Sequence, residues 1–118
     1  MVTHRRPGPN PDEMITGALH TIAIRGWVPP TGPDREARLN ELRDAARGRT
    51  DLLIQVAGVI LGTRVDDEYD PRYVKHTAGA AMLLELADVT DDDPQVQRWF
   101  AAGRERRDRN RIRLQHDW

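Results

Sequence analysis

The most concentrated run of apolar residues spans 52–62, and Gln55 is the only polar side chain inside it. A helix that is apolar on every side must be buried on every side, because an exposed face would leave hydrocarbon in water. The run is shorter than the roughly 18–20 apolar residues that cross a bilayer. We therefore predict that residues 52–62 form the centre of a soluble core.

The apolar positions before this run continue its helical spacing across Gly48. Two interpretations fit the pattern: one helix over about 34–62 with a kink near Gly48, or two helices separated there, with Thr50 capping the second. The shared apolar face favours the single bent helix. The positions on that face are Leu39, Leu42, Ala46, Leu53, Val56 and Ile60.

Three further helices are predicted by a repeated start signal, in which an asparagine or aspartate is followed by proline. The polar side chain can accept a hydrogen bond from the first helical turn, and proline fits the first helical position. These pairs are Asn10–Pro11, Asp70–Pro71 and Asp93–Pro94, and they open helices of about 11–25, 71–88 and 94–114. A strand at 21–25 would have no partner. The predicted fold is an all-α bundle of four to five helices.

The predicted helix at 71–88 carries apolar residues at helical spacing and a group of small residues. Its apolar positions are Val74, Ala78, Ala81 and Leu84, with Met82 and Leu83 beside them. Small side chains let two backbones approach closely and add dispersion contacts. We expect Gly58 and Gly62 to receive the small residues at 78–81. Trp27, in the proline-rich connector 26–33, is expected to fold back over the core.

The two ends of the chain differ in composition. Residues 1–10 are rich in proline and glycine and offer almost nothing to bury, so a disordered tail is predicted there. Residues 11–118 are predicted to form a single domain, because the full 118 residues match the size of one domain. The N-terminal segment lacks the apolar region of a signal peptide, and we expect a cytoplasmic protein.

Composition removes several classes of chemistry. The chain has no cysteine and no serine, which excludes disulfides, thiolate metal sites and serine or cysteine nucleophiles. The formal net charge is -1, so no global field favours nucleic acid or an anionic membrane. No metal, cofactor or membrane association is expected.

A metal-dependent enzyme is the least favoured alternative. It would use the acidic loop at 66–70, with Asp66, Asp67 and Asp70 as oxygen ligands and His76 nearby. The loop lacks the alternation and turn glycine of a calcium loop, and no two histidines share helical ligand spacing. Acidic residues at these positions are better explained as helix caps, since helix N-termini attract negative charge.

The last predicted helix is the most basic part of the chain. Residues 98–116 hold seven arginines against Glu105 and Asp108, a local charge of +5, whereas residues 66–93 carry a local charge of -7. Four of the arginines fall on one side of the helix, where they could contact phosphate. These are Arg98, Arg106, Arg109 and Arg113. A helix-turn-helix is rejected, because its second helix would meet DNA with an acidic end.

Apolar residues occupy the other side of the last helix and point to an interface. Aromatic residues concentrate binding energy, and the residues on this side are Trp99, Phe100, Leu114 and Trp118. We therefore expect a non-enzymatic helical interaction module that binds a macromolecular partner, as a homodimer through its C-terminal helix. The alternative is a small nucleic-acid-associated regulator that uses the four arginines.

Overall fold

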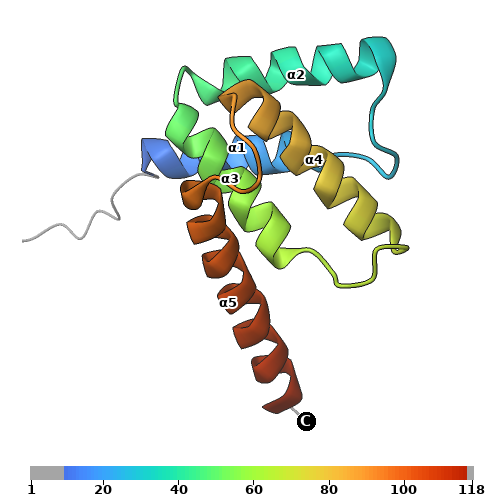
Figure 1. Cartoon of the computed structure of the whole chain (residues 1–118), viewed down its shortest axis with the longest axis vertical. Coiled ribbons are helices and arrows are strands. Elements are labelled where there is room, and N and C mark those ends of the chain that lie inside the picture. The colour runs from blue at the N-terminus through green and yellow to red at the C-terminus, as the bar shows by residue number, and fades with distance from the viewer. Residues whose placement is uncertain (1–9, 117–118) are drawn as a thin grey trace, which may run out of the picture.

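The computed structural model describes the backbone of residues 10–116 and the side chains of residues 10–111. This part of the chain is all-α, as predicted, and contains five helices and no strand (Figure 1). The helices are α1 (Pro11–Ala23), α2 (Gly32–Ala46), α3 (Thr50–Thr63), α4 (Pro71–Ala87) and α5 (Pro94–His116). The tail predicted at 1–10 lies, except for Asn10, outside the described residues.

Helix α3 is the centre of the bundle. Nine of its 14 residues are buried, and it contacts each of the other four helices. Its apolar surface on every side explains this position, because burying α3 removes more hydrocarbon from water than burying any other segment could. The predicted central role of residues 52–62 is confirmed.

The chain breaks between α2 and α3. Arg47 has φ 51° and Gly48 has φ 77°, and two consecutive left-handed residues cannot continue a right-handed helix. The single bent helix over 34–62 is therefore wrong, and the alternative of a break near Gly48 is confirmed. Arg49 occupies the N-cap position, so that Thr50 is the first residue of α3 rather than its cap.

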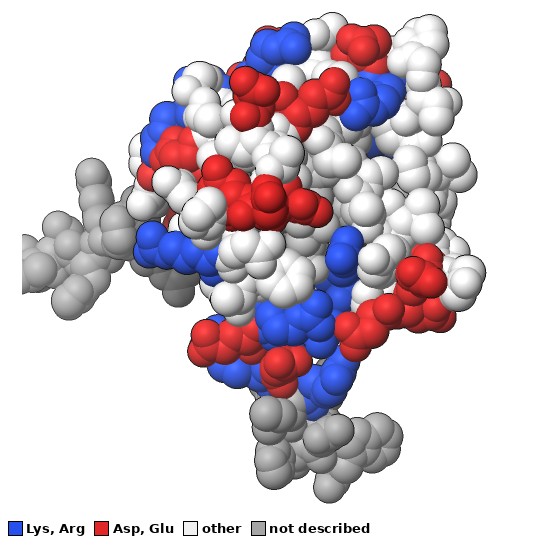
Figure 2. Space-filling view, viewed as in Figure 1, with Lys and Arg blue, Asp and Glu red and all other residues white. Residues whose placement is uncertain are grey.

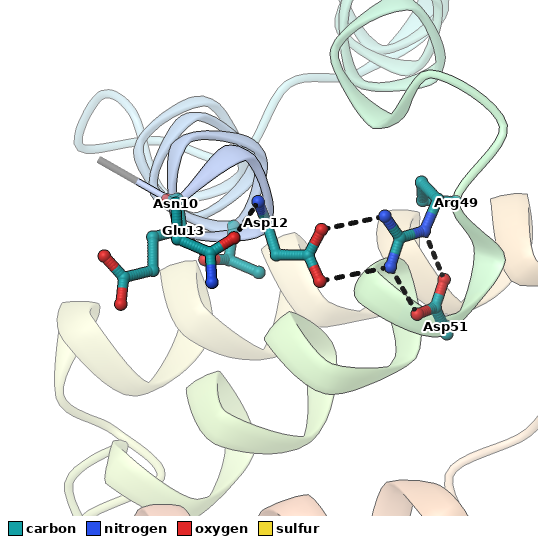
Figure 3. Close-up of polar contacts among 6 residues, drawn as sticks. Asn10, Asp12, Glu13, Arg49 and Asp51 are labelled. Atoms are coloured by element: carbon teal, nitrogen blue, oxygen red, sulfur yellow. Dashed lines mark hydrogen bonds and ion pairs between the residues drawn. The ribbon is translucent and has the colours of Figure 1, made fainter. Parts of the chain in front are cut away.

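Arg49 joins the first turns of α1 and α3. Figure 3 shows its guanidinium between Asp12 and Asp51. Nη1 donates to Oδ1 of Asp12 at 2.8 Å, and Nη2 donates to Oδ2 of Asp51 at 2.9 Å. The hydrogen bond from Arg49 lowers the pKa of Asp51. Because these groups are partly exposed to water, the two ion pairs contribute little to the stability of the fold.

The predicted start signals act as caps. The side chain of Asn10 accepts a hydrogen bond from the backbone N–H of Asp12 at 2.9 Å. Asp70 accepts one from Arg72 at 2.8 Å, and Asp93 accepts one from Gln95 at 2.9 Å. Each cap satisfies one backbone donor that has no partner inside its helix.

Glycines set the contact between α3 and α5. A Cβ on Gly58 would lie 2.7 Å from the carbonyl oxygen of Val96, and one on Gly103 would lie 2.7 Å from that of Val59. Gly58 and Gly62 therefore receive α5, and the prediction that they receive residues 78–81 of α4 is wrong. The matching glycine on α4 is Gly79, which packs against Ala23 of α1.

Helix α5 packs on α3 and on no other described helix. Its last described contact with the bundle comes at Arg107, which donates from Nη1 to the carbonyl oxygen of Arg64 just after α3 ends. Residues 108–116 then continue beyond the bundle, as Figure 1 shows. None of the described helices is long and apolar enough to cross a membrane.

Candidate interaction surface

The aromatic residues predicted to form an interface on α5 face the bundle. Trp99 and Phe100 are half-buried and pack against the core. The Cβ of Trp99 lies against Gly58, and the backbone of Phe100 lies against Gly58 and Gly62, so the register of both residues is set by α3. The side chains of Leu114 and Trp118 lie outside the described part. The structure thus places two of these four residues on the inner face of α5.

The predicted phosphate-binding arginines lie in different surroundings. The guanidinium of Arg98 lies 5.7 Å from the ring centroid of Trp99, and Arg106 lines a cleft beside α1. Arg109 is exposed. The side chain of Arg113 is outside the described residues.

Two other arginines of α5 bind the acidic loop. Arg104 and Arg107 donate to the same oxygen of Asp66, at 3.1 and 2.8 Å. The hydrogen bonds from Arg107 and Arg104 lower the pKa of Asp66. Part of the charge of the basic helix is therefore neutralised within the molecule.

The acidic residues considered as metal ligands have other partners. Asp67 accepts a hydrogen bond from the backbone N–H of Tyr69 at 2.9 Å. Asp70 caps α4 and pairs with Arg72, and this side-chain hydrogen bond lowers the pKa of Asp70 to about 2. The Nδ1 atom of His76 is buried without a hydrogen-bond partner. The described residues contain no group of three potential ligands that could hold a metal ion.

A surface that the sequence did not predict covers the outer side of α4. Three large hydrophobic side chains are exposed on or beside this helix: Trp27 at 79%, Tyr69 at 86% and Val74 at 46%. Trp27 is not a lid over the core, because its ring lies in water with the Lys75 ammonium 5.5 Å from its centroid. We call the five residues Trp27, Pro29, Tyr69, Tyr73 and Val74 the α4 surface.

A shallow groove of about 560 Å³ runs through the α4 surface. Its lining carries only one charged side chain, Glu68, and its floor is formed by the small side chains of Ala78 and Ala81. In the space-filling view the area over α4 carries few charges, and acidic side chains lie below it on the loop that follows α3 (Figure 2). An exposed apolar area with a polar rim is typical of an interaction site.

The sequence contains a signal for this surface, but the same helical spacing is also typical of residues in a core. Val74, Ala78 and Ala81 follow helical spacing, yet Val74 and Ala81 are exposed. The buried side of α4 is a second apolar stripe, which includes Ala80, Met82, Leu83 and Ala87. Two apolar stripes on one helix indicate either complete burial or one free interface, and periodicity alone cannot separate these cases.

Comparison with protein-family models, with curated proteins and with solved structures finds no match for this chain. Function therefore has to be argued from the surfaces themselves.

The lowered pKa values of two partly buried histidines predict how the stability of the fold depends on pH. Burial lowers the pKa of His20, with a further contribution from the positive charge of Arg106. Burial also lowers the pKa of His76, and the positive charge of Lys75 adds to this effect. A histidine with a lowered pKa in the folded state stays neutral while the unfolded chain takes up a proton. The free energy of unfolding should therefore be constant at high pH and fall as the pH drops below about 6.5.

Urea unfolding at a series of pH values from about 8 to about 5 measures this effect. The double variant His20→Gln/His76→Gln is expected to lose most of the slope in this window. The carboxylates with lowered pKa values, such as Asp66 and Asp70, act only in the more acidic range below about pH 4. An equal slope in the double variant and the native chain would contradict the assignment to these two histidines.

Proposed function

We propose that the chain is a non-enzymatic interaction module that binds a protein partner at the α4 surface. We further propose that this partner is the C-terminal part of α5 from a second copy of the chain. The observation that carries the proposal is the grouping of exposed hydrophobic side chains. Three of the five large ones in the described part of the chain belong to the α4 surface.

Exposure of these side chains to water is unfavourable, so a partner that covers them would gain free energy. Each square ångström of apolar surface removed from water contributes about 25 cal/mol. Tyrosine and tryptophan also concentrate binding energy at interfaces. Tyr69 and Tyr73 line the groove, and the ring of Trp27 lies beside Lys75 of the same helix.

The charges around the groove indicate which kind of partner would bind there. Glu68 lines the groove and Asp67 precedes it in the loop, and neither forms an ion pair with the described residues. They would favour a basic segment. The projecting part of α5 fits this requirement, since residues 108–116 contain three arginines against Asp108. Electrostatic complementarity of this kind sets the choice of partner and the orientation of binding.

The position of α5 also supports an exchange between two copies. Residues 108–116 extend about 13 Å at 1.5 Å per residue, and no other described helix packs against them. The segment is the end of the 23-residue helix α5, so it could reach a partner as the extension of a helix that is already packed on α3. In a two-fold dimer each copy would donate this segment and receive the other, so that the contact forms twice.

A glutamate in the groove is expected to disrupt the dimer. Val74→Glu places a charge among the apolar side chains and should weaken self-association about tenfold or more, with little change in melting temperature because Val74 is exposed. Sedimentation equilibrium measures the association constant. Met14→Glu is the matched control, because Met14 is exposed on α1 outside the α4 surface.

Charge reversal tests the choice of partner. Asp67→Lys/Glu68→Lys and Arg109→Glu/Arg111→Glu should each weaken the dimer, and the combination of all four changes should restore part of the affinity. A chain that remains monomeric at about 100 µM would contradict self-association. Equal effects of Val74→Glu and Met14→Glu would remove the α4 surface as the interface.

A further inference from the structure

One glycine inside a helix has no structural explanation in the chain itself. Glycine in a helix interior costs about 1 kcal/mol relative to alanine. Gly58, Gly62, Gly79 and Gly103 each meet the backbone of a neighbouring helix at distances that leave no room for a Cβ. A Cβ on Gly17 would meet nothing within 4 Å. The bare backbone of α1 at Gly17 is therefore open to an external group.

Gly17 lines a cleft of about 500 Å³ between α1, α3 and α5. The cleft exists because α5 packs on α3 without touching α1. Val56 and Val59 of α3 form its apolar floor, and polar side chains of α1 and α5 form its walls. This volume is within the range of small-molecule sites, which combine an apolar lining with a few convergent polar groups.

Five polar side chains that line the cleft form no hydrogen bond with the described residues: Glu13, His20, Thr21, Gln55 and Arg106. Gln55 is the only polar residue inside the apolar run of α3, and it is half-buried. The polar atoms of His20, Gln55 and Arg106 are not among the buried atoms that lack a partner, so they remain open to water and could donate to or accept from a ligand. By contrast, the hydroxyl of Thr63 is satisfied within its own helix by the carbonyl oxygen of Val59, at 2.9 Å.

The charges in the cleft define two different ends. Arg106 approaches His20 and contributes, after burial, to the lowered pKa of this histidine. On α4, the side chain of His76 lies within electrostatic range of His20. Glu13 is seven residues from His20 along α1, which corresponds to about 10 Å. The end at Arg106 is therefore positive, and the opposite end favours a hydrogen-bond donor or a cation.

We propose that this cleft binds a small amphipathic organic anion, either a carboxylate or a phosphate monoester. The anionic group pairs with Arg106, and the apolar part lies over Val56 and Val59 against the backbone of Gly17. Guanidinium forms two parallel hydrogen bonds with either kind of anion. The amide of Gln55 supplies a further donor and acceptor from the floor. This site is on a different part of the molecule from the α4 surface and does not depend on dimer formation.

Titration of the ¹⁵N-labelled full chain with phenyl phosphate at low salt tests the proposal by NMR. Benzoate tests the carboxylate, inorganic phosphate lacks the apolar part, and phenol lacks the charge. Phenyl phosphate or benzoate should give saturable shifts at Gly17, Val59 and Arg106. Inorganic phosphate and phenol should bind about tenfold more weakly or not at all.

Two variants separate the cleft from general anion binding. Arg106→Gln should weaken binding about tenfold or more, because it removes the charge-assisted hydrogen bonds. Arg109→Gln, one turn further on an exposed part of α5, should leave binding unchanged. Gly17→Leu should fill the cleft and abolish binding, while the melting temperature stays equal or rises because leucine favours helix.

The proposal is overturned if neither phenyl phosphate nor benzoate gives saturable shifts by about 10 mM. It is also overturned if the shifts spread equally over all exposed arginines, or if Gly17→Leu binds as the native chain does. If inorganic phosphate bound as tightly as phenyl phosphate, the apolar part of the ligand would contribute nothing, which would contradict an amphipathic ligand.

Discussion

Replacement of Gly62 by alanine is expected to destabilise the protein by about 3 kcal/mol. The added Cβ would lie 2.8 Å from the backbone nitrogen of Arg104 and 3.0 Å from Cα of Gly103, and it would approach the carbonyl oxygen of Phe100 more closely still. All three groups belong to the backbone of α5, so no side-chain rotation can relieve the clash. The two helices would have to separate along their whole contact.

Urea unfolding followed by circular dichroism measures this loss. Gly17→Ala is the matched control, because its Cβ enters open space. That variant is expected to gain about 0.5–1 kcal/mol by limiting the freedom of the unfolded chain. If Gly62→Ala were as stable as the native protein, the close packing of α5 on α3 would be contradicted.

Leu42→Ala is expected to cost about 3 kcal/mol and to loosen α2. This helix buries only Leu39, Leu42 and Ala46, and Leu42 is the only one of the three with no exposed surface. Truncation leaves a cavity beneath a helix that has few other attachments. The ion pairs Arg25–Glu41 and Arg35–Glu85, which also hold α2, are exposed and add little.

Hydrogen exchange distinguishes loosening of α2 from a uniform loss of stability. The amides of α2 should lose protection before those of α3 in Leu42→Ala, because α2 can detach while the central contacts remain. Asn40→Ala, at an exposed position of the same helix, should change neither stability nor protection by a measurable amount. Equal loss of protection in α2 and α3 would indicate a single cooperative unit.

The candidate sites could be predicted from the sequence only in part. The projecting basic helix is readable from its composition, and the two apolar stripes of α4 are readable from their spacing. The sequence does not show which stripe faces outward, because Val74 and Leu83 are both apolar residues at helical spacing. The exposure of Trp27 depends on the path of the proline-rich connector. This path places the Trp27 ring beside Lys75.

Gly17 is a second residue whose surroundings could not be predicted from the sequence. In the sequence Gly58 and Gly62 stand out because they lie in the apolar run, whereas Gly17 is a glycine in an ordinary amphipathic segment with no sign of a special role. Only the three-dimensional arrangement shows that these two touch α5, whereas Gly17 faces a cleft. Distance between helices, which no local pattern contains, is what distinguishes a packing glycine from one that lines a site.

The sequence by itself determined the all-α class, the starts of α1, α4 and α5, and the central position of α3. These features follow from local chemistry: a capping side chain and a proline act on the next turn, and a segment that is apolar on every side must be buried. The tertiary structure decided the break at Arg47–Gly48, the helix that Gly58 and Gly62 receive, and the exposure of the α4 surface. These features depend on how helices far apart in the chain pack together in one core. Each helix pair competes with the alternative pairs for the same apolar surface, and no local pattern shows which pair is more stable.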